Sequence, residues 1–461
     1  MIRILRWSAA VVAALALFVV AVHLVSRAMG PSEAERQALL LVDAPPQLPP
    51  GRDGFAALYT LRHDVPQAEQ ARVLAEDVRR FAATSPLALG ETGDAPAWHS
   101  VLDDWPQLPA GLPDEPRWCP LREAGCVDRV RAAPGAYASL VARNATLLDR
   151  TAALAGYDYF HNPFAARLDM PIPAYQPLTW LPTRHAWRFV NGQVDEALAG
   201  ACGDVALGRR VIEASDSLIT SMISAALVRG NATLLADMLA ELPRDHPLPA
   251  QCSQAFGHPL AVDRAMCGAM LGEGRFSMAG LRTQIAGQIA AGTSGYDGPA
   301  WAHRLLFDPE RTAARWAPTF AWYCGDQARE LIVADRPLVD ATPPPSRWSL
   351  ACASNAVGCI LADIDRPAYR DYGRRLQDAD ARLRAMAALL WLRKQEGAID
   401  EAALARLPES MRSPARPLRL DLSAATLGTA LYAQSRPDRD HDGTWTVPLP
   451  ASRLQSAGAS P

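Results

Sequence analysis

The chain has 461 residues, nearly balanced charges and eight cysteines. Its formal net charge is −3 at pH 7, from 46 basic and 49 acidic side chains. Interspersed charges of this kind argue against a nucleic-acid-binding face or a polybasic lipid-binding patch, so we expect no nucleic-acid partner. The length exceeds one ordinary compact core, which predicts several lobes or an elongated helical array.

Residues 1–30 carry the pattern of a membrane anchor. Arg3 and Arg6 precede an almost unbroken apolar run from Trp7 to Val25, long enough as a helix to cross a hydrocarbon layer of about 30 Å. The basic flank predicts a cytoplasmic N-terminus and export of the rest. Because no second apolar run of about 18 residues follows, we expect a single crossing of a bacterial inner membrane, with the C-terminal domain in the periplasm.

A cleaved signal peptide is the alternative for this segment. Signal peptides share the basic start, but their apolar core has only about 7 to 15 residues. Ser26, Arg27 and Ala28 resemble a small-x-small cleavage site, in which Arg27 fits poorly. The length of the apolar run favours a retained anchor.

Proline-rich breaks divide the exported part into helical blocks. The predicted lobes are an N-terminal helical lobe at 31–180, a central helical array at 181–345, a C-terminal helical lobe with a small hairpin at 346–450, and a disordered tail at 451–461. The predicted fold class is mainly α, an irregular array of tetratricopeptide-like helix pairs with a small β element near the C-terminus.

The central block has the clearest helical spacing. Apolar residues between Val194 and Leu242 recur at intervals of three and four, which predicts three helices. Ser215-Asp216 is the expected N-cap of the second helix, and Gly230-Asn231 is the expected turn before the third. Farther on, Leu383, Met386 and Leu390 predict the buried face of another amphipathic helix.

The cysteines all follow the apolar run: Cys119, Cys126, Cys202, Cys252, Cys267, Cys324, Cys352 and Cys359. An even number fits an oxidising periplasm and predicts disulfide bonds. Zinc is the other interpretation, but the sequence has no CxxC motif and no paired His/Cys spacing.

The tightest disulfide candidate joins Cys119 to Cys126, because Pro120 and Gly125 between them break helix geometry. Cys252 and Cys267 are candidates for closing a second loop. For the last pair, the sequence allows two interpretations: a Cys352–Cys359 bond across a helix break near Gly358, or a bond from one of them to Cys324.

An acidic turn near the C-terminus resembles half of a calcium-binding loop. Asp438, Asp440 and Asp442 alternate before Gly443, as the ligands of such loops do. The twelfth loop position is Leu449 instead of a bidentate Glu, so the site lacks one ligand. A solvated turn closing a hairpin is therefore the plainer interpretation. Calcium is the one cofactor that the sequence suggests.

Catalytic patterning is weak. The sequence contains no GxSxG, HExxH, Walker A or GxGxxG motif. His161 and His185 lie in aromatic-rich surroundings where a base can be tuned, although packing between helices is the simpler role. Paired acids occur at Asp103-Asp104 and at Glu213 with Asp216. The tryptophans in loop-like stretches are candidates for contact with a partner or a glycan: Trp98, Trp105, Trp118, Trp180 and Trp348.

Three segments resemble a proteobacterial group of uncharacterised single-pass envelope proteins. They are Gly51–Pro66 (GRDGFAALYTLRHDVP), Trp118–Arg131 (WCPLREAGCVDRVR) and the helical pair Arg209–Leu242 with SDSLITSMISAALVRG. The stretch Leu383–Gly443 is also loosely similar to the tails of other bacterial helical proteins. The resemblance implies the topology and the helical fold, and it implies no activity, ligand or functional residue.

These observations favour a binding or scaffolding role at the cell envelope, with an envelope protein as the partner. A periplasmic hydrolase with unidentified catalytic residues is the second hypothesis, and a calcium-stabilised structural module is the third. An enzyme is the less favoured class, because no catalytic motif is present.

Overall fold

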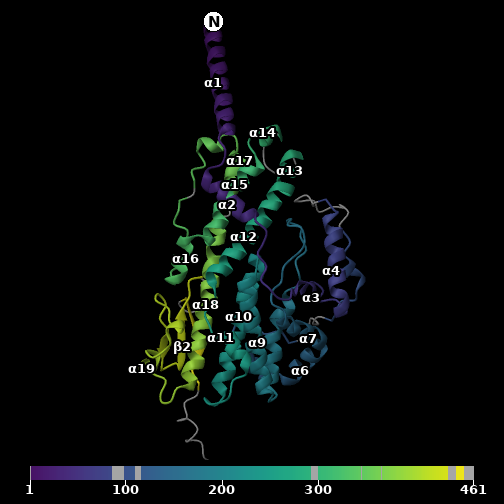
Figure 1. Ribbon diagram of the computed structural model, residues 1–461, viewed down its shortest axis with the longest axis vertical. Helices are drawn as coiled ribbons and strands as arrows, with labels where there is room; N and C mark the ends of the chain where they lie inside the picture. Colours follow the sequence, from purple (N-terminus) through teal and green to yellow (C-terminus); the bar gives the residue numbers. More distant parts are fainter. Residues whose placement is uncertain are drawn as a thin grey trace, which may run out of the picture.

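The computed structural model shows a mainly helical body from which one long helix projects (Figure 1). It describes residues 2–85, 98–109, 116–291, 300–343, 345–364, 366–433 and 443–450. A three-stranded antiparallel sheet lies near the C-terminus. The predicted mainly helical class with an apolar N-terminal helix and a small β element is confirmed.

The N-terminal half surrounds two long central helices with shorter ones. Its elements are α1 (Ile2–Ala28), α2 (Glu33–Asp43), α3 (Phe55–Tyr59), α4 (Gln67–Ala82), η1 (Val101–Asp104), α5 (Cys126–Ala132), α6 (Pro134–Arg143), α7 (Ala145–Ala153), η2 (Leu154–Gly156), η3 (Gln176–Trp180), α8 (Leu181–Val190), α9 (Val194–Ala214) and α10 (Leu218–Glu241).

The C-terminal half adds further helices and the sheet. Its elements are α11 (Ala250–Phe256), α12 (Val262–Gly280), η4 (Leu281–Ile285), α13 (Ala286–Ala291), α14 (Ala300–Leu305), α15 (Pro309–Ala321), η5 (Trp322–Cys324), α16 (Asp326–Val333), η6 (Leu350–Cys352), α17 (Ala356–Ile364), α18 (Arg366–Lys394), α19 (Glu401–Leu404), η7 (Glu409–Met411), β1 (Arg419–Asp421), β2 (Thr426–Ala430) and β3 (Thr444–Pro448).

Helix α1 stands clear of the body over most of its length (Figure 1). Its apolar part, Arg6–Ala28, is long and apolar enough to cross a membrane, and its most apolar 18 residues are not buried in the protein. The last turn differs, because Ser26 is buried and its Oγ lies 2.8 Å from Ser354 Oγ. Arg311 also donates to the carbonyl oxygen of Met29. The apolar helix therefore enters the body without an intervening linker.

Helices α9 and α10 pack along each other at the centre of the body. Helix α10 begins after Ser217, whose Oγ accepts a hydrogen bond from the Thr220 amide. The cap therefore lies just beyond the predicted Ser215-Asp216, because the chain is still extended at Ser217. A hydroxyl at this position satisfies one of the free amides at the helix start.

The predicted turn at Gly230-Asn231 is wrong, since α10 runs unbroken from Leu218 to Glu241. Asn231 stays helical, and its buried amide donates to the Leu227 carbonyl oxygen. A Cβ on Gly230 would lie 2.4 Å from a methyl carbon of Leu121. This glycine therefore allows close packing of the 121 loop on the helix, and it does not act as a helix stop.

Helix α10 is also long and apolar enough to cross a membrane. However, 61% of its most apolar stretch is buried inside the protein. Its apolar residues face α8, α9, α12 and α18, so the helix is a core helix of the body.

Helix α18 connects the central helices to the C-terminal sheet (Figure 1). Leu383, Met386 and Leu390 are buried in the main core, as predicted from their spacing. The strand order is β1-β2-β3, with Leu427 of β2 opposite Val447 of β3. Both side chains are buried against the helical core, so the sheet is part of the body.

A buried ionic cluster fixes the sheet to α18. The Arg416 guanidinium is 1% exposed and donates to Asp335 at 2.5 Å and to Asp378 at 2.8 Å. Asp378 also accepts from the Tyr432 and Ala433 amides. Burial raises the pKa of Asp378. Burial alone would raise the pKa of Asp335 too, but the hydrogen bond and charge of Arg416 outweigh it and hold that pKa below its ordinary value.

Candidate functional site

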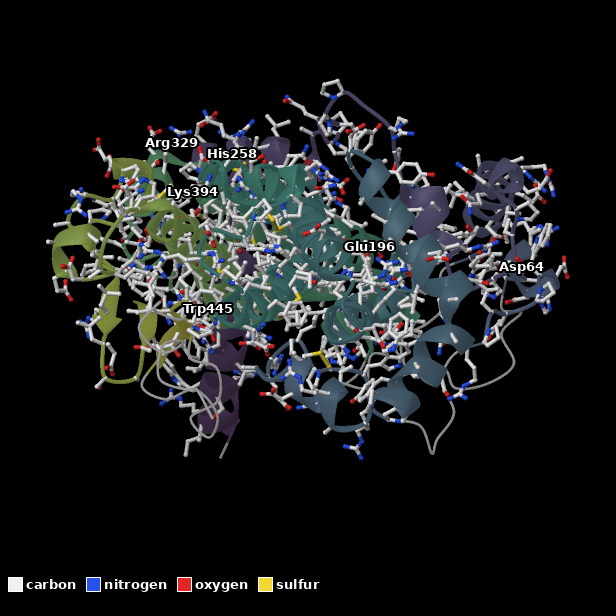
Figure 2. All side chains as sticks on the ribbon, turned by 90° about the horizontal axis from the view of Figure 1, so that it is seen from below. Asp64, Glu196, His258, Arg329, Lys394 and Trp445 are labelled. Atoms are coloured by element: carbon white, nitrogen blue, oxygen red, sulfur yellow. A yellow bond between two sulfur atoms is a disulfide. The ribbon has the colours of Figure 1, made fainter. Side chains whose placement is uncertain are left out.

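The eight cysteines form four disulfide bonds, which are drawn in yellow among the helices in Figure 2. The pairs are Cys119–Cys126, Cys202–Cys252, Cys267–Cys324 and Cys352–Cys359. The predicted Cys119–Cys126 bond is confirmed. Disulfides and an exposed apolar helix together indicate a secreted or envelope protein.

The predicted closure of a loop between Cys252 and Cys267 is wrong. Cys252 lies on α11, which packs on α9 and brings it to Cys202 with a Cα separation of 4.8 Å. Cys267 lies on α12 and reaches Cys324 in η5, where the Cα separation is 4.6 Å. Both bonds are therefore set by helix packing, and they join residues that are far apart in sequence.

The last two cysteines bond locally, and the helix break lies elsewhere than expected. Cys352 closes η6, and the chain turns at Ala353 to Asn355 before α17 begins at Ala356. Gly358 is helical, so the break precedes it. A Cβ there would lie 1.9 Å from Thr312 Oγ1, and the glycine is required by the close contact between α15 and α17.

The proposed calcium ligands Asp438, Asp440 and Asp442 lie outside the described residues. The neighbouring Gly443 has a φ of +65° directly before β3. Leu449, at the twelfth position of the loop pattern, directly follows β3 and donates its amide to the Ala425 carbonyl oxygen before β2. Among the described residues, no group of three His, Cys, Asp or Glu side chains is placed to hold a metal ion.

His161 and Asp216 form a partly exposed pair. Nδ1 of His161 lies 2.7 Å from Oδ2 of Asp216, and the side chains are 27% and 19% exposed. The hydrogen bond that the Asp216 carboxylate accepts from the imidazole raises the pKa of His161 against the opposing effect of burial. Glu213, the predicted acidic partner of Asp216, instead accepts from the Ala261 amide. An imidazole paired in this way is able to exchange protons near neutral pH.

His185 forms a second pair with Asp204, but this one is inside the protein. Nε2 of His185 lies 2.8 Å from Oδ2 of Asp204, and the side chains are 2% and 9% exposed. A Cβ on Gly200 would lie 2.3 Å from the imidazole, so the glycine makes room for the ring between α8 and α9. The pair joins two core helices and has no access for a substrate.

Most of the tryptophans predicted to contact a partner or a glycan pack against other aromatic or apolar side chains. Trp118 stacks on Trp180 with ring centroids 4.8 Å apart, and Trp98 lies on Phe81 with centroids 5.6 Å apart. Trp105 packs at the edge of the same small core as Trp98. Trp348 differs, because it is 91% exposed.

An open groove of about 310 Å³ lies between α3, α4 and α7. This volume is at the lower limit of ordinary ligand sites. Apolar side chains of Ala57, Val65 and Leu154 line part of it. Sequence reasoning missed this groove, because its walls come from segments about 100 residues apart that no local motif connects.

The polar side of the groove carries two guanidinium groups and two amides. Arg52 donates to the Gly156 carbonyl oxygen and lies over the Tyr157 ring at 5.5 Å. Arg150 pairs with Asp64 at 3.0 Å, and Figure 2 shows Asp64 at the side of the body opposite Lys394. Gln67 and Gln70 of α4 complete this side. The arrangement offers several donors for carboxylates or backbone carbonyls above an apolar floor.

Comparison of the chain with models of protein families, with curated proteins and with solved structures yields no match in any of the three.

Proposed function

We propose that the protein is a single-pass inner-membrane protein of the bacterial envelope whose periplasmic helical body binds a partner protein. The length of the apolar part of α1 and its basic flank support this topology. The division of the body into three lobes and the tetratricopeptide-like pairing of its helices belong to the same proposal, since helical arrays supply extended binding surfaces.

The observation that carries the binding role is the groove between α3, α4 and α7. Its floor is apolar, while Arg52, Arg150, Gln67 and Gln70 supply the donors. The Arg150 guanidinium is held in place by Asp64 and by the His63 carbonyl oxygen, so it loses little conformational entropy on binding. An extended peptide with acidic side chains matches this set of donors.

The experiment places a photo-crosslinking amino acid at Gln67, which is exposed at the groove, in the full chain in living cells. The matched control is Arg72 on the same helix, which is exposed but does not line the groove. We expect one envelope protein to crosslink at position 67 and not at 72, and the adduct to disappear on Arg150→Glu. Equal adducts at both positions, or none, would count against the groove as a binding site.

A hydrolase is the second candidate, and the His161–Asp216 pair is the observation that favours it. A cavity lined by Phe160 and Thr220, residues close in sequence to His161 and Asp216, measures only about 20 Å³. That volume holds about one water molecule and no substrate. If a His161→Asn variant binds the partner protein as before, and cells that carry it grow like cells with the unaltered protein, the His161–Asp216 pair has no catalytic role.

A calcium-stabilised module is the third candidate, and it depends on Asp438, Asp440 and Asp442. Calcium that binds only the folded state would raise the melting temperature, because binding shifts the folding equilibrium toward that state. The test compares melting in excess calcium and in excess chelator. An unchanged melting temperature would dismiss the site.

A further inference from the structure

The end of the body from which α1 emerges exposes several large apolar side chains. Trp348 is 91% exposed and Trp301 is 65% exposed, while Leu305, Leu350 and Ile360 are each between 43% and 46% exposed. Single exposed apolar residues are ordinary on protein surfaces. Two open tryptophans with three aliphatic residues on adjoining elements instead indicate a contact surface.

These residues come from neighbouring elements, one of which packs against the base of α1. The 3-10 turn η6, which includes Leu350, packs against α1. The Val357 amide at the start of α17 donates to the Leu306 carbonyl oxygen just after α14. Ser26 of α1 is hydrogen-bonded to Ser354 between η6 and α17. Figure 1 shows α14 and α17 at the end of the body where α1 leaves it.

The length of α1 fixes the height of this end above the bilayer. Its apolar part, Arg6–Ala28, has 23 residues and therefore rises about 34 Å. The hydrocarbon layer takes up about 30 Å of that length. Because Ser26 in the last turn is already buried in the body, no chain remains to lift the body away from the lipid.

We propose that this end of the body is a second membrane-binding element. Its surface, here called the proximal face, consists of Trp301, Leu305, Trp348, Leu350 and Ile360, and it inserts into the headgroup layer of the leaflet from which α1 emerges. Tryptophan side chains favour that layer because the ring is apolar and its N–H still reaches water or lipid oxygens. This inference rests on the retention of α1 in the proposed function.

Charge and position agree with a lipid surface as the occupant. Arg347, exposed next to Trp348, brings a guanidinium to the level of the lipid phosphates. The proximal face continues directly from the membrane helix, whereas α3 and α7 of the groove lie farther from the exit of α1 (Figure 1). Two attachments hold the body in one orientation and leave the groove accessible from the periplasm.

The test uses the full chain with Trp7→Phe, which removes the tryptophan inside α1, in nanodiscs of phosphatidylethanolamine and phosphatidylglycerol. One set of discs contains lipids brominated close to the glycerol, which quench only tryptophans within contact. We expect bromine-dependent quenching of the emission, and we expect Trp301→Phe with Trp348→Phe to remove more than half of it. The control, Trp445→Phe on the sheet at the opposite end, should leave the quenching unchanged.

Absence of bromine-dependent quenching while the chain stays in the discs would overturn the proposal, and it would leave the anchor itself intact. Unquenched emission with two chains per disc would overturn it as well, because a second copy would then cover the proximal face. Failure of the chain to remain in the discs would instead contradict the proposed function. A Leu305→Ser variant, which keeps every tryptophan, should weaken the bromine-dependent quenching, whereas Leu422→Ser, at an exposed residue directly after β1, should not.

Discussion

Removing the Cys202–Cys252 bond should cost more stability than removing the Cys119–Cys126 bond. The first closes a separation of 50 residues and the second closes one of 7. In the chain-entropy treatment these lengths correspond to about 4.1 and about 2.4 kcal/mol at 25 °C. The expected difference is therefore about 1.7 kcal/mol.

The comparison is matched because all four cysteines are buried, with exposures between 0% and 6%. Double Cys→Ala variants then lose similar side-chain volume at both sites, so packing losses largely cancel in the difference. The assay is urea unfolding of the oxidised full chain in detergent, followed by far-UV circular dichroism, with the stability taken from midpoint and slope.

Equal losses in the two variants, or a larger loss at Cys119–Cys126, would refute the reasoning that loop length sets the contribution. Addition of reductant supplies the control: the stability of each variant should fall further, because reductant breaks the three disulfide bonds that remain in it. The rate at which mild reductant breaks each bond is a separate, kinetic property and does not bear on the difference in stability.

Three further outcomes are expected. Gly200→Ala should lower the free energy of unfolding by about 1–3 kcal/mol, because its Cβ would lie 2.3 Å from a buried imidazole. The control is Gly203→Ala, whose Cβ has nothing within 4 Å and which should be neutral or slightly stabilising in the same denaturation assay. Arg416→Met should cost about 3–5 kcal/mol at neutral pH, because it removes the ion pair of the buried Asp378 and leaves Asp335 with Arg384 alone. Acidification should recover part of that loss in urea unfolding, and a loss below about 1 kcal/mol would show the cluster to be unimportant. Asp216 raises the pKa of His161 above 6.5, so their hydrogen bond stabilises the fold fully below that pH, and this contribution is lost as pH rises through the folded-state pKa. His161→Asn should therefore be destabilising at about pH 5.5 and neutral at about pH 9. A loss of stability that grows with pH would contradict the assignment.

The parts of the fold that could be predicted are those that local sequence patterns determine. The spacing of Leu383, Met386 and Leu390 identified a buried helix face, because helical periodicity is local. The Cys119–Cys126 bond was predictable for the same reason, since proline and glycine lie inside the short loop that it closes.

Properties that depend on distant neighbours were not predictable. Gly230 looked like a turn because glycine marks turns and close contacts alike, and only the position of Leu121 distinguishes them. Cys202 and Cys252 meet because α11 packs on α9, a contact that sequence spacing does not specify. The groove combines residues near 52, 67 and 150 and left no sequence signal.

The central claim is that α1 remains in the membrane and holds the body outside the cytoplasm. The most direct measurement treats spheroplasts expressing the full chain with external protease and then follows fragments of the chain in washed membranes and in the soluble fraction. The body should be digested from outside, while a fragment containing α1 stays with the membranes. A body protected from protease, or a shorter chain that begins at Met29 and is free of membranes, would contradict the claim.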